Sequence, residues 1–403
     1  MEEIRLKDIC DLDNGYAFKS DDYVESSNTL NCRMSNIRPD GSFDILYSAK
    51  YLPDEFVKKY KNYVLNDGDL IIAMTDMAGD PKILGVPTVV DTKGYKLLLN
   101  QRVGRLRFIR DGINADYLKF ALQCKRVRDY LKMFAGGGVQ LNVSKKDILN
   151  APIRMRAIGE QQSIADLLKR IIKLQKLREQ ELQHFDNLIK ARFVELFGDL
   201  MENPFNWPMK TIADVSLFLK SGLSRKLSDE DIGLPVIRSG NIQNGQFIFD
   251  NVKYWYKDDP QGANTKDYVL EDGDVLVNFI NSSSQIGKTA IYRDTGRDCI
   301  YTTNIFRMKL ADNCNEYYYN WFAMSDYYYR HLQNIIQPAV NQSSFTTVNF
   351  LKLPIPLPAK DKQNEFAEFV KQVDKSKVVV PSKIKNAIFA IMLSVSFGQI
   401  TSI

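Results

Sequence analysis

The sequence predicts an α+β protein in which two similar mixed α/β domains are separated by long helices that pair as an antiparallel coiled coil. Three observations support this fold class: an internal repeat, an uninterrupted amphipathic segment between the two copies, and a second amphipathic segment after the second copy. The chain has 403 residues and 44% hydrophobic content. This length is enough for about two or three domains, each with its own core.

The repeat is clearest in two stretches that lie 205 residues apart (269 minus 64). Residues 64–76 read VLNDGDLIIAMTD, and residues 269–281 read VLEDGDVLVNFIN. In each stretch an Asp-Gly turn precedes a short apolar run, which is typical of a turn that leads into a β-strand. The same strand is therefore expected at this place in both copies.

Other blocks recur in the same order, with spacings that drift by a few residues. They pair RMSNI (33–37) with RSGNI (238–242), LGVPTVVD (84–91) with IGKTAIYRD (286–294), DILNAPI (147–153) with NFLKLPI (349–355), and EQQSIADLL (160–168) with KQNEFAEFV (362–370). Two copies are too few for a solenoid and fit two globular domains. We predict domains at residues 1–158 and 200–358, with helical regions at residues 159–199 and 359–403.

Residues 160–197 form the first helical region. They contain no proline, and their apolar residues recur at steps of three and four, the spacing of one helix face. Such a helix would extend about 57 Å at 1.5 Å per residue. Because its apolar face must be buried, a partner helix is expected from residue 359 onward. Pro381 interrupts that second region, which limits the predicted partner to roughly 20 residues.

Each domain is expected to carry a helix in its second half, at about residues 114–134 and 316–336. The second of these contains the aromatic runs YYYNWF (317–322) and YYYR (327–330). At helical spacing, such side chains are expected to pack in the core rather than to stack on bases.

Composition argues against several classes of protein. The charged N-terminus MEEIRLKD is unlike a signal peptide, and the apolar stretch at 387–397 is too short to span a bilayer. Five cysteines without a close pair and only two histidines, His184 and His331, argue against zinc, disulfides and a histidine-based triad. We expect a reduced, cytoplasmic protein without a cofactor of its own. With a net charge of +5, any nucleic-acid surface would have to be local.

Gly287-Lys288-Thr289 is similar to the end of a phosphate-binding P-loop. A P-loop also needs a glycine five residues before the Gly-Lys pair, where this chain has Ser282. The equivalent of Gly287 in the first copy is Gly85, which Val-Pro follows. A turn before the next strand is the favoured interpretation in both copies, and nucleotide hydrolysis is a weak alternative.

The chain resembles the specificity subunit of Type I restriction–modification systems. The resemblance covers nearly the whole chain and rests on the order of the repeats and on GEQQSIADLL, LIKARFVELFGD, NPFNWPMKTIADV and LKLPIPLPAKDKQNEFAEFVKQVDKSK. It implies two target recognition domains, each reading half of a bipartite, asymmetric site on double-stranded DNA. The helical regions would set the gap and dock two methyltransferase (modification) subunits, with restriction/translocase subunits outside.

The resemblance also implies that catalysis belongs to these partners, which would bind S-adenosylmethionine, ATP and magnesium. The chain itself has no Asn-Pro-Pro-Tyr methylation motif. It departs from the family pattern after about residue 377, so a recombined or truncated specificity subunit with altered assembly is one alternative. A non-catalytic helical scaffold for protein partners is another, and salt-sensitive, sequence-selective DNA binding would argue against it.

Base recognition favours Arg or Lys for guanine and Asn or Gln for adenine, on loops that face the groove. Candidates in the first copy are Lys19, Ser20, Arg33, Ser35, Asn36, Arg38, Thr75, Asp76, Lys82, Gln101, Arg102, Gln140, Asn142, Ser144 and Lys145. Candidates in the second copy are Ser221, Ser224, Arg225, Lys226, Arg238, Ser239, Asn241, Asn281, Ser282, Ser283, Ser284, Gln285, Lys288, Thr302, Thr303, Asn304, Asn341, Gln342, Ser343 and Ser344.

Overall fold

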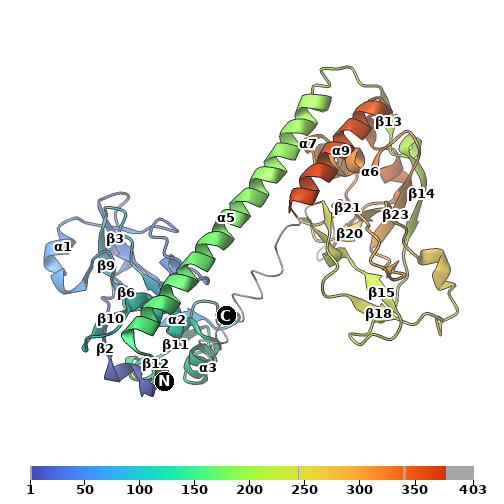
Figure 1. Cartoon of the computed structure of the whole chain (residues 1–403). Helices are drawn as coiled ribbons and strands as arrows, with labels where there is room; N and C mark the ends of the chain where they lie inside the picture. The colour runs from blue at the N-terminus through green and yellow to red at the C-terminus, as the bar shows by residue number, and fades with distance from the viewer. Residues whose placement is uncertain (1, 244, 339–341, 378–403) are drawn as a thin grey trace. The chain divides into compact units, whose positions relative to one another are not determined.

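The computed structural model describes residues 2–243, 245–338 and 342–377. The predictions for Asn341 and for the segment after residue 377, including Pro381, lie outside these residues. The described chain divides into two compact units, with the boundary between Arg178 and Glu179 in a long helix, α5 (Ile158–Phe197) (Figure 1). Each unit is described separately below.

The first unit is built on two four-stranded sheets. Its strands are β1 (Glu2–Arg5), β2 (Cys10–Asn14), β3 (Thr29–Cys32), β4 (Tyr51–Leu52), β5 (Val64–Leu65), β6 (Leu70–Ala73), β7 (Thr75–Met77), β8 (Pro87–Val89), β9 (Lys96–Leu99), β10 (Val103–Phe108), β11 (Gln140–Asn142) and β12 (Pro152–Met155). Its other helices are α1 (Phe56–Lys59), α2 (Ala115–Gln123), α3 (Lys125–Met133) and α4 (Lys145–Leu149). The sheet orders are β2-β10-β6-β8 and β4-β3-β9-β5, and β1 pairs with β12.

The second unit has a similar arrangement, with a four-stranded sheet and a three-stranded sheet. Its strands are β13 (Met209–Thr211), β14 (Ser216–Ser221), β15 (Leu234–Ile237), β16 (Ile242–Gln243), β17 (Gln246–Phe247), β18 (Lys253–Trp255), β19 (Val275–Asn278), β20 (Ile280–Asn281), β21 (Thr289–Ile291), β22 (Ile300–Tyr301), β23 (Ile305–Leu310), β24 (Ser343–Ser344) and β25 (Pro354–Pro356). Its helices are α6 (Glu316–Phe322), α7 (Asp326–Gln333), α8 (Thr347–Leu351) and α9 (Lys360–Lys377). The orders of the two sheets are β14-β23-β19-β21 and β18-β15-β22.

The two units share their topology. The order β14-β23-β19-β21 matches β2-β10-β6-β8, and the terminal pair β13·β25 matches β1·β12. A parallel pair of strands in each unit also corresponds, since β3 runs parallel to β9 and β15 runs parallel to β22. The predicted pair of similar mixed α/β domains is therefore confirmed.

The prediction of one continuous helix in the second half of each domain was wrong. In each unit this segment forms two short helices. In the first unit Cys124 takes an extended conformation, with φ −62° and ψ 147°, and separates α2 from α3. In the second unit Ser325 interrupts the helix and caps α7 by accepting a hydrogen bond from the Tyr328 N–H. An N-cap residue has a non-helical backbone conformation, so Ser325 ends the preceding helical segment and begins α7.

The core of the second unit contains the aromatic runs, as predicted. Tyr318, Tyr319, Phe322 and Tyr328 are each 0–1% exposed. Burial raises the pKa of Tyr319 well above its ordinary value, so this hydroxyl stays protonated.

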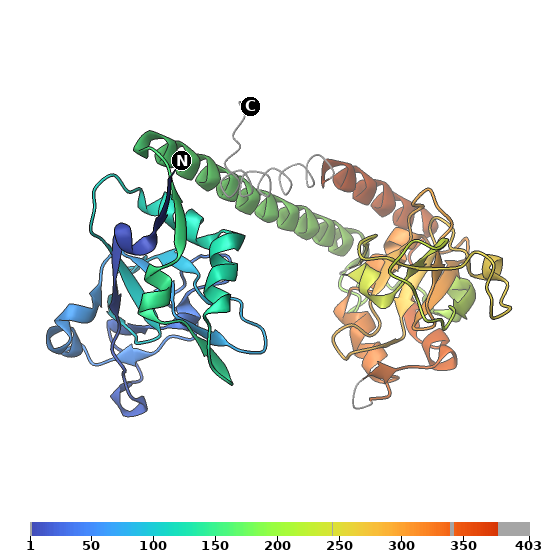
Figure 2. The same cartoon turned by 90° about the horizontal axis from the view of Figure 1, so that it is seen from below.

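The expected antiparallel helix pair is present in the second unit, between the C-terminal part of α5 and α9 (Figure 1, Figure 2). The rings of Phe193 and Phe366 lie 5.4 Å apart, edge to face. Arg192 Nη2 lies 2.6 Å from Glu365 Oε1, at the N-terminal part of α9. Lys377 Nζ, at the last described position of α9, lies 2.9 Å from Asp186 Oδ1. Because α5 numbers fall as α9 numbers rise, the two helices run in opposite directions.

A buried glutamine joins the helix to the domain in both units. Gln161 Oε1 accepts from the Asn114 N–H (2.9 Å), and Gln161 Nε2 donates to the carbonyls of Gly112 (3.1 Å) and Arg156 (2.8 Å). Gln363 makes the same three bonds, to Asn315, Asn313 and Pro358. These glutamines are 1% and 0% exposed. The repeat thus extends to single hydrogen bonds.

The twin glycines of the apparent P-loop are both turn residues. Gly85 has φ +68° and Gly287 has φ +78°, a left-handed conformation that favours glycine. The Gly287 N–H donates to the Asn278 carbonyl at 2.7 Å. Thr289, which is 1% exposed, donates its hydroxyl to Asn320 Oδ1 at 2.8 Å. Since these groups are engaged within the protein, they are not available to a nucleotide phosphate.

The change Gly287→Ala is expected to lower the free energy of unfolding of the second unit by about 2 kcal/mol. A Cβ at this position would lie 2.1 Å from Leu332 Cδ2, in addition to the backbone strain. Gly273→Ala is the matched control, because Gly273 also has a positive φ (+87°) but would meet nothing within 4 Å. Urea unfolding measures both, and equal losses would contradict the contact with Leu332.

Candidate nucleic-acid interface

In the first unit, three loops that are distant in sequence meet at Met74. The Met74 N–H donates to the Arg102 carbonyl at 3.0 Å, and its carbonyl accepts from the Val143 N–H at 2.9 Å. Next in the chain, Thr75 donates its hydroxyl to Asn142 Oδ1 at 2.8 Å. The structure thereby brings together three predicted groups: residues 75–76, 101–102 and 140–142.

The second unit has the same junction at Phe279. Its N–H donates to the Asn304 carbonyl at 3.2 Å, and its carbonyl accepts from the Phe345 N–H at 3.3 Å. β20 then pairs with β24, with Asn281 opposite Ser343. The predicted groups at 281–285, 302–304 and 342–344 are therefore adjacent, apart from Asn341, which is not among the described residues.

A polar groove of about 390 Å³ lies beside this junction in the second unit. It is lined by Ser239, Gly240, Ile242, Gln243, Asn281, Gln285 and Lys288. Four of these residues were predicted from two separate loops. Gln243 was missed, because a single glutamine after an apolar residue carries no distinctive pattern.

The groove has no acidic side chain in its lining. Within the described part of the chain, the side-chain amide of Gln285 has no hydrogen-bond partner, and no carboxylate lies within 4.0 Å of the Lys288 ammonium. Asn281 uses one side-chain oxygen, which accepts from the Ser282 N–H at 2.8 Å. The groove therefore offers amide donors and acceptors and one cation to an external polar partner.

Two predicted asparagines, Asn36 and Asn241, form hydrogen bonds within the protein. Asn36 is 1% exposed; its Oδ1 accepts from the Arg33 N–H at 2.8 Å, and its Nδ2 donates to the carbonyls of Asp44, Ile45 and Tyr47. Asn241 does the same in the second unit, accepting from the Arg238 N–H at 2.9 Å. Through these hydrogen bonds the two side chains fix the conformation of the loops at residues 44–47 and 248–250.

The arginines of these loops are also engaged. Arg33 Nη2 donates to the Ser48 carbonyl and Arg238 Nη2 donates to the Asn251 carbonyl, both at 2.6 Å. Arg38 instead lies over the ring of Tyr47, with 3.8 Å between the guanidinium carbon and the ring centroid. Stacking leaves its N–H groups pointing along the plane of the guanidinium, where they can reach an acceptor.

The other predicted residues are spread over a range of exposure. The exposed ones are Lys19, Ser20, Lys82, Gln101, Arg102, Asn142, Ser144, Ser224, Lys226, Ser282, Ser283, Ser284 and Gln342. The half-buried ones are Ser35, Gln140, Lys145, Ser221, Arg225, Thr302, Thr303, Asn304 and Ser344. Thr75, Asp76 and Ser343 are buried. Ser144 caps α4, where its hydroxyl accepts from the Asp147 N–H.

Arg225 is held by a covered carboxylate. Its Nε and Nη2 lie 3.0 Å and 2.5 Å from Asp259 Oδ2, and the Asp259 side chain is 0% exposed. The hydrogen bonds from Arg225 lower the pKa of Asp259 to about 2. This pair fixes the loop that carries Ser224 and Lys226.

The Arg225–Asp259 pair predicts an acid-sensitive second unit. Since the pKa of Asp259 is lower in the folded chain than its ordinary 3.8, the pair stabilises the fold fully above about pH 4. The stabilisation is lost as the pH falls from about 4 toward 2. Unfolding midpoints measured from pH 2 to 6 are expected to fall less steeply in Asp259→Asn, which should also be less stable at pH 6. Parallel curves for the two chains would contradict this.

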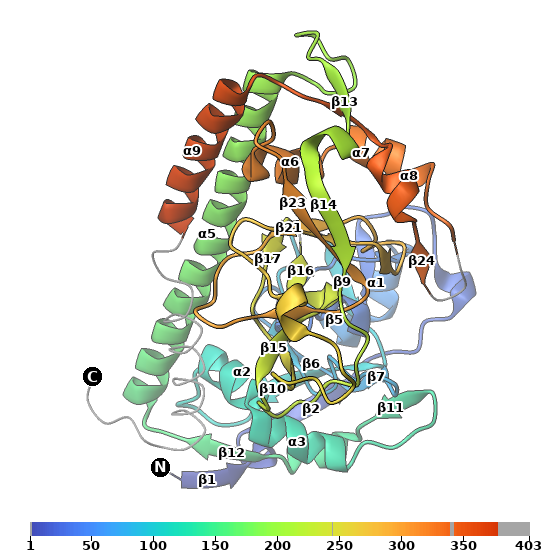
Figure 3. The ribbon, with the colours of Figure 1, turned by 90° about the vertical axis from the view of Figure 1, so that its right-hand side faces the viewer.

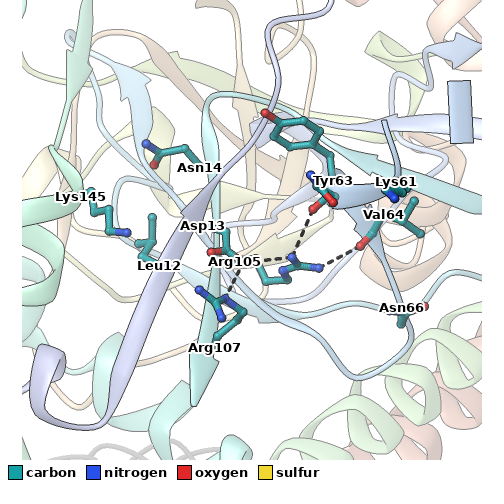
Figure 4. A pocket seen from close by; sticks show the side chains of 11 residues that line it. Leu12, Asp13, Asn14, Lys61, Tyr63, Val64, Asn66, Arg105, Arg107 and Lys145 are labelled. Atoms are coloured by element: carbon teal, nitrogen blue, oxygen red, sulfur yellow. Dashed lines mark hydrogen bonds and ion pairs between the residues drawn. The ribbon is translucent and has the colours of Figure 1, made fainter. Parts of the chain in front are cut away.

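A cavity of about 610 Å³ in the first unit is lined by several basic side chains (Figure 4). Three of these side chains are already paired. Arg105 Nη2 and Arg107 Nε lie 3.0 Å and 2.7 Å from Asp13 Oδ2. Lys145 Nζ lies 2.8 Å from Asp11 Oδ1. In the second unit, Arg307 takes the place of Arg105 and pairs with Asp274 Oδ2 at 2.6 Å. We therefore interpret this cluster as a structural network rather than as the interface.

Among the described residues, no group of three His, Cys, Asp or Glu side chains could hold a metal ion. None of the helices in this part of the chain has the length and hydropathy to cross a bilayer.

Solved structures of Type I restriction–modification proteins have a similar fold. The S subunit of the Type I restriction–modification system from M. genitalium matches with a TM-score of 0.57 and 12% identity, covering 98% of this chain and 94% of that one. A chain from a structure on complex assembly and conformational transition of the type I R-M system matches with a TM-score of 0.51 and 16% identity, covering 98% and 97%.

Comparison with curated sequences gives the same family. The Type I restriction enzyme EcoKI specificity subunit of Escherichia coli (strain K12) is 20% identical over 375 residues, covering 88% of this chain and 77% of the relative. The MjaVIII specificity subunit of Methanocaldococcus jannaschii is 27% identical over 192 residues, 47% of this chain. That match spans only 43% of the relative, and a second relative from the same organism is matched over 41% of its length. Residues 1–184 and 204–389 both match the family described as Type I restriction modification DNA specificity domain, and the chain therefore belongs to this family.

Proposed function

We propose that this chain recognises a bipartite, asymmetric site on double-stranded DNA and directs methyltransferase and restriction subunits to it. In this proposal residues 1–158 and 200–358 are the two target recognition domains. Residues 159–199 are the spacer helix, and residues 359–403 supply its partner. Catalysis, with S-adenosylmethionine, ATP and magnesium, belongs to the partner subunits.

The shared junction at Met74 and Phe279 is the observation that carries the proposal. In each unit the same backbone contacts bring polar loops to one place, although the loops are far apart in sequence. Amide and guanidinium side chains at such a place match the hydrogen-bonding edges of bases in the major groove. A scaffold for proteins alone would have no need to gather them twice.

The two junctions carry different side chains, which supports an asymmetric site. Thr75 and Arg102 in the first unit correspond to Ile280 and Asn304 in the second. Because base-edge contacts specify sequence whereas phosphate contacts only position the protein, different side chains at one position should read different bases.

Methylation mapping tests the proposal. The chain is expressed with its neighbouring methyltransferase in a methylation-free host, and modified adenines are mapped across the genome. The expected result is a bipartite motif with a fixed gap, and a chain with Asn142→Ala should alter only one half of that motif. No modification, or a change in both halves, would contradict the proposal.

A further inference from the structure

The two short strands β7 and β11 form a ribbon at one side of the first unit (Figure 3). They are antiparallel, with Thr75 opposite Asn142 and Met77 opposite Gln140. The pairing continues past the strands, where the Ala78 N–H donates to the Val139 carbonyl at 3.1 Å.

The ribbon is held in a defined shape. Asp76, which is 5% exposed, accepts backbone hydrogen bonds from Met77 (2.8 Å) and Leu84 (2.9 Å), and also one from Ile83. At the turn, Gly137 has φ +136°, and a Cβ there would lie 1.9 Å from the Gln140 carbonyl oxygen. The buried carboxylate and the obligatory glycine limit the shapes that the ribbon can take.

The ribbon presents apolar side chains to solvent beside amides. Met77 is 50% exposed and Val139 is 78% exposed. Residues two apart on a strand share a face, so Met77 lies on the face of Thr75, with Gln140 and Asn142 across from them. Val139 directly precedes Gln140, so it lies on the opposite face of the ribbon from Met77, Gln140 and Asn142.

DNA bases in the major groove offer matching chemistry. This groove is about 12 Å wide and admits a two-stranded ribbon; thymine presents a methyl group there, and adenine presents a donor and an acceptor that match an Asn or Gln amide. We propose that the β7–β11 ribbon enters the major groove of the half-site read by the first unit, where Met77, on the same face as the amides of Gln140 and Asn142, contacts a thymine methyl group. This inference rests on the proposed function.

Charge favours DNA over a protein partner. The carboxylate of Asp76 is occupied by backbone N–H groups, and Asp80 is paired with Lys82 at 3.0 Å. Arg102, exposed and joined to the base of the ribbon through Met74, has no ion pair within the described residues.

The equivalent ribbon of the second unit, β20–β24, differs from the β7–β11 ribbon at the position of Met77. With the 205-residue offset between β7 and β20, Ser282 stands where the first unit has Met77. Ser343 stands opposite Asn281, at the place of Leu141 in the first unit. At the place of Met77 the second unit therefore has a serine, so recognition of a thymine methyl group at this position is expected in one half-site only.

Replacing thymine by uracil tests the inference, because it removes only the methyl group. The chain assembled with its methyltransferase is titrated with DNA duplexes in which each thymine of the mapped site is replaced in turn. For wild type, one or more replacements in one half-site should weaken binding on the order of fourfold per methyl, from about 0.8 kcal/mol per buried CH₂ group and 1.4 kcal/mol per tenfold.

Variants assign the effect to the ribbon. Met77→Ala and Met77→Ser should lose the difference between thymine and uracil, whereas Met133→Ser should keep it, since Met133 is 80% exposed but lies outside the ribbon. Wild-type binding that ignores every replacement, or ribbon variants that keep the full difference, would overturn the inference. So would ribbon variants that fail only to assemble with the methyltransferase, which would mark a protein contact. These results leave the proposed function standing, whereas a wild-type complex without sequence preference would overturn both.

Discussion

Replacing Gln363 by leucine is expected to lower the free energy of unfolding of the second unit by about 4 kcal/mol. The side chain is 0% exposed and satisfies three backbone groups, those of Asn315, Asn313 and Pro358. Leucine has a similar volume but no polar atom, so all three groups would stay buried without a partner, each at a cost of about 1–3 kcal/mol. Chemical unfolding followed by circular dichroism and tryptophan fluorescence measures the loss.

Two matched variants make this prediction specific. Asn364→Ala removes an exposed neighbour whose Oδ1 accepts from Asn315 Nδ2 at 3.0 Å, and is expected to cost less than about 1 kcal/mol. Gln161→Leu should destabilise the first unit as much as Gln363→Leu destabilises the second, because the same three bonds are lost. A Gln363→Leu chain as stable as Asn364→Ala would show that these buried bonds contribute little.

Gln285→Ala is expected to weaken discrimination at one base pair by about 1–3 kcal/mol, in the half-site read by the second unit. The Gln285 amide lines the polar groove and has no hydrogen-bond partner among the described residues, so the change should leave the fold intact. Methylation maps of the variant should show one relaxed position and an unaltered first half-site.

Lys288→Ala is the contrasting variant in the same groove. If Lys288 contacts a phosphate, affinity should fall for all sequences and the salt dependence should decrease by about one counterion. Gln261→Ala removes an exposed glutamine side chain outside the groove lining, and is expected to change neither the motif nor the affinity. If Gln285→Ala and Gln261→Ala gave identical maps, the groove would not be a recognition surface.

The repeat was predictable in detail because each copy must bury the same core. The Asp-Gly turns, the apolar runs at 70–73 and 275–278, and the paired glutamines each reappear as equivalent strands or buried contacts. The long helix was predictable for a similar reason, since a stripe of apolar residues without proline has one regular solution. The breaks between α2 and α3 and between α6 and α7 were not predictable. Each depends on the conformation of one residue, Cys124 or Ser325, which decides whether the helix continues or a new one begins.

The candidate site could be predicted from the sequence only in part. The sequence by itself determined where polar residue types cluster, and Asn281, Gln285 and Lys288, which belong to one such cluster, line the polar groove. It could not separate them from Asn36 and Asn241, which have the same chemistry but are buried as loop supports. That distinction depends on contacts between distant segments, through the junctions at Met74 and Phe279. Only the tertiary structure decides which amides are satisfied internally and which remain open, because a hydrogen-bond partner far along the chain leaves no local trace.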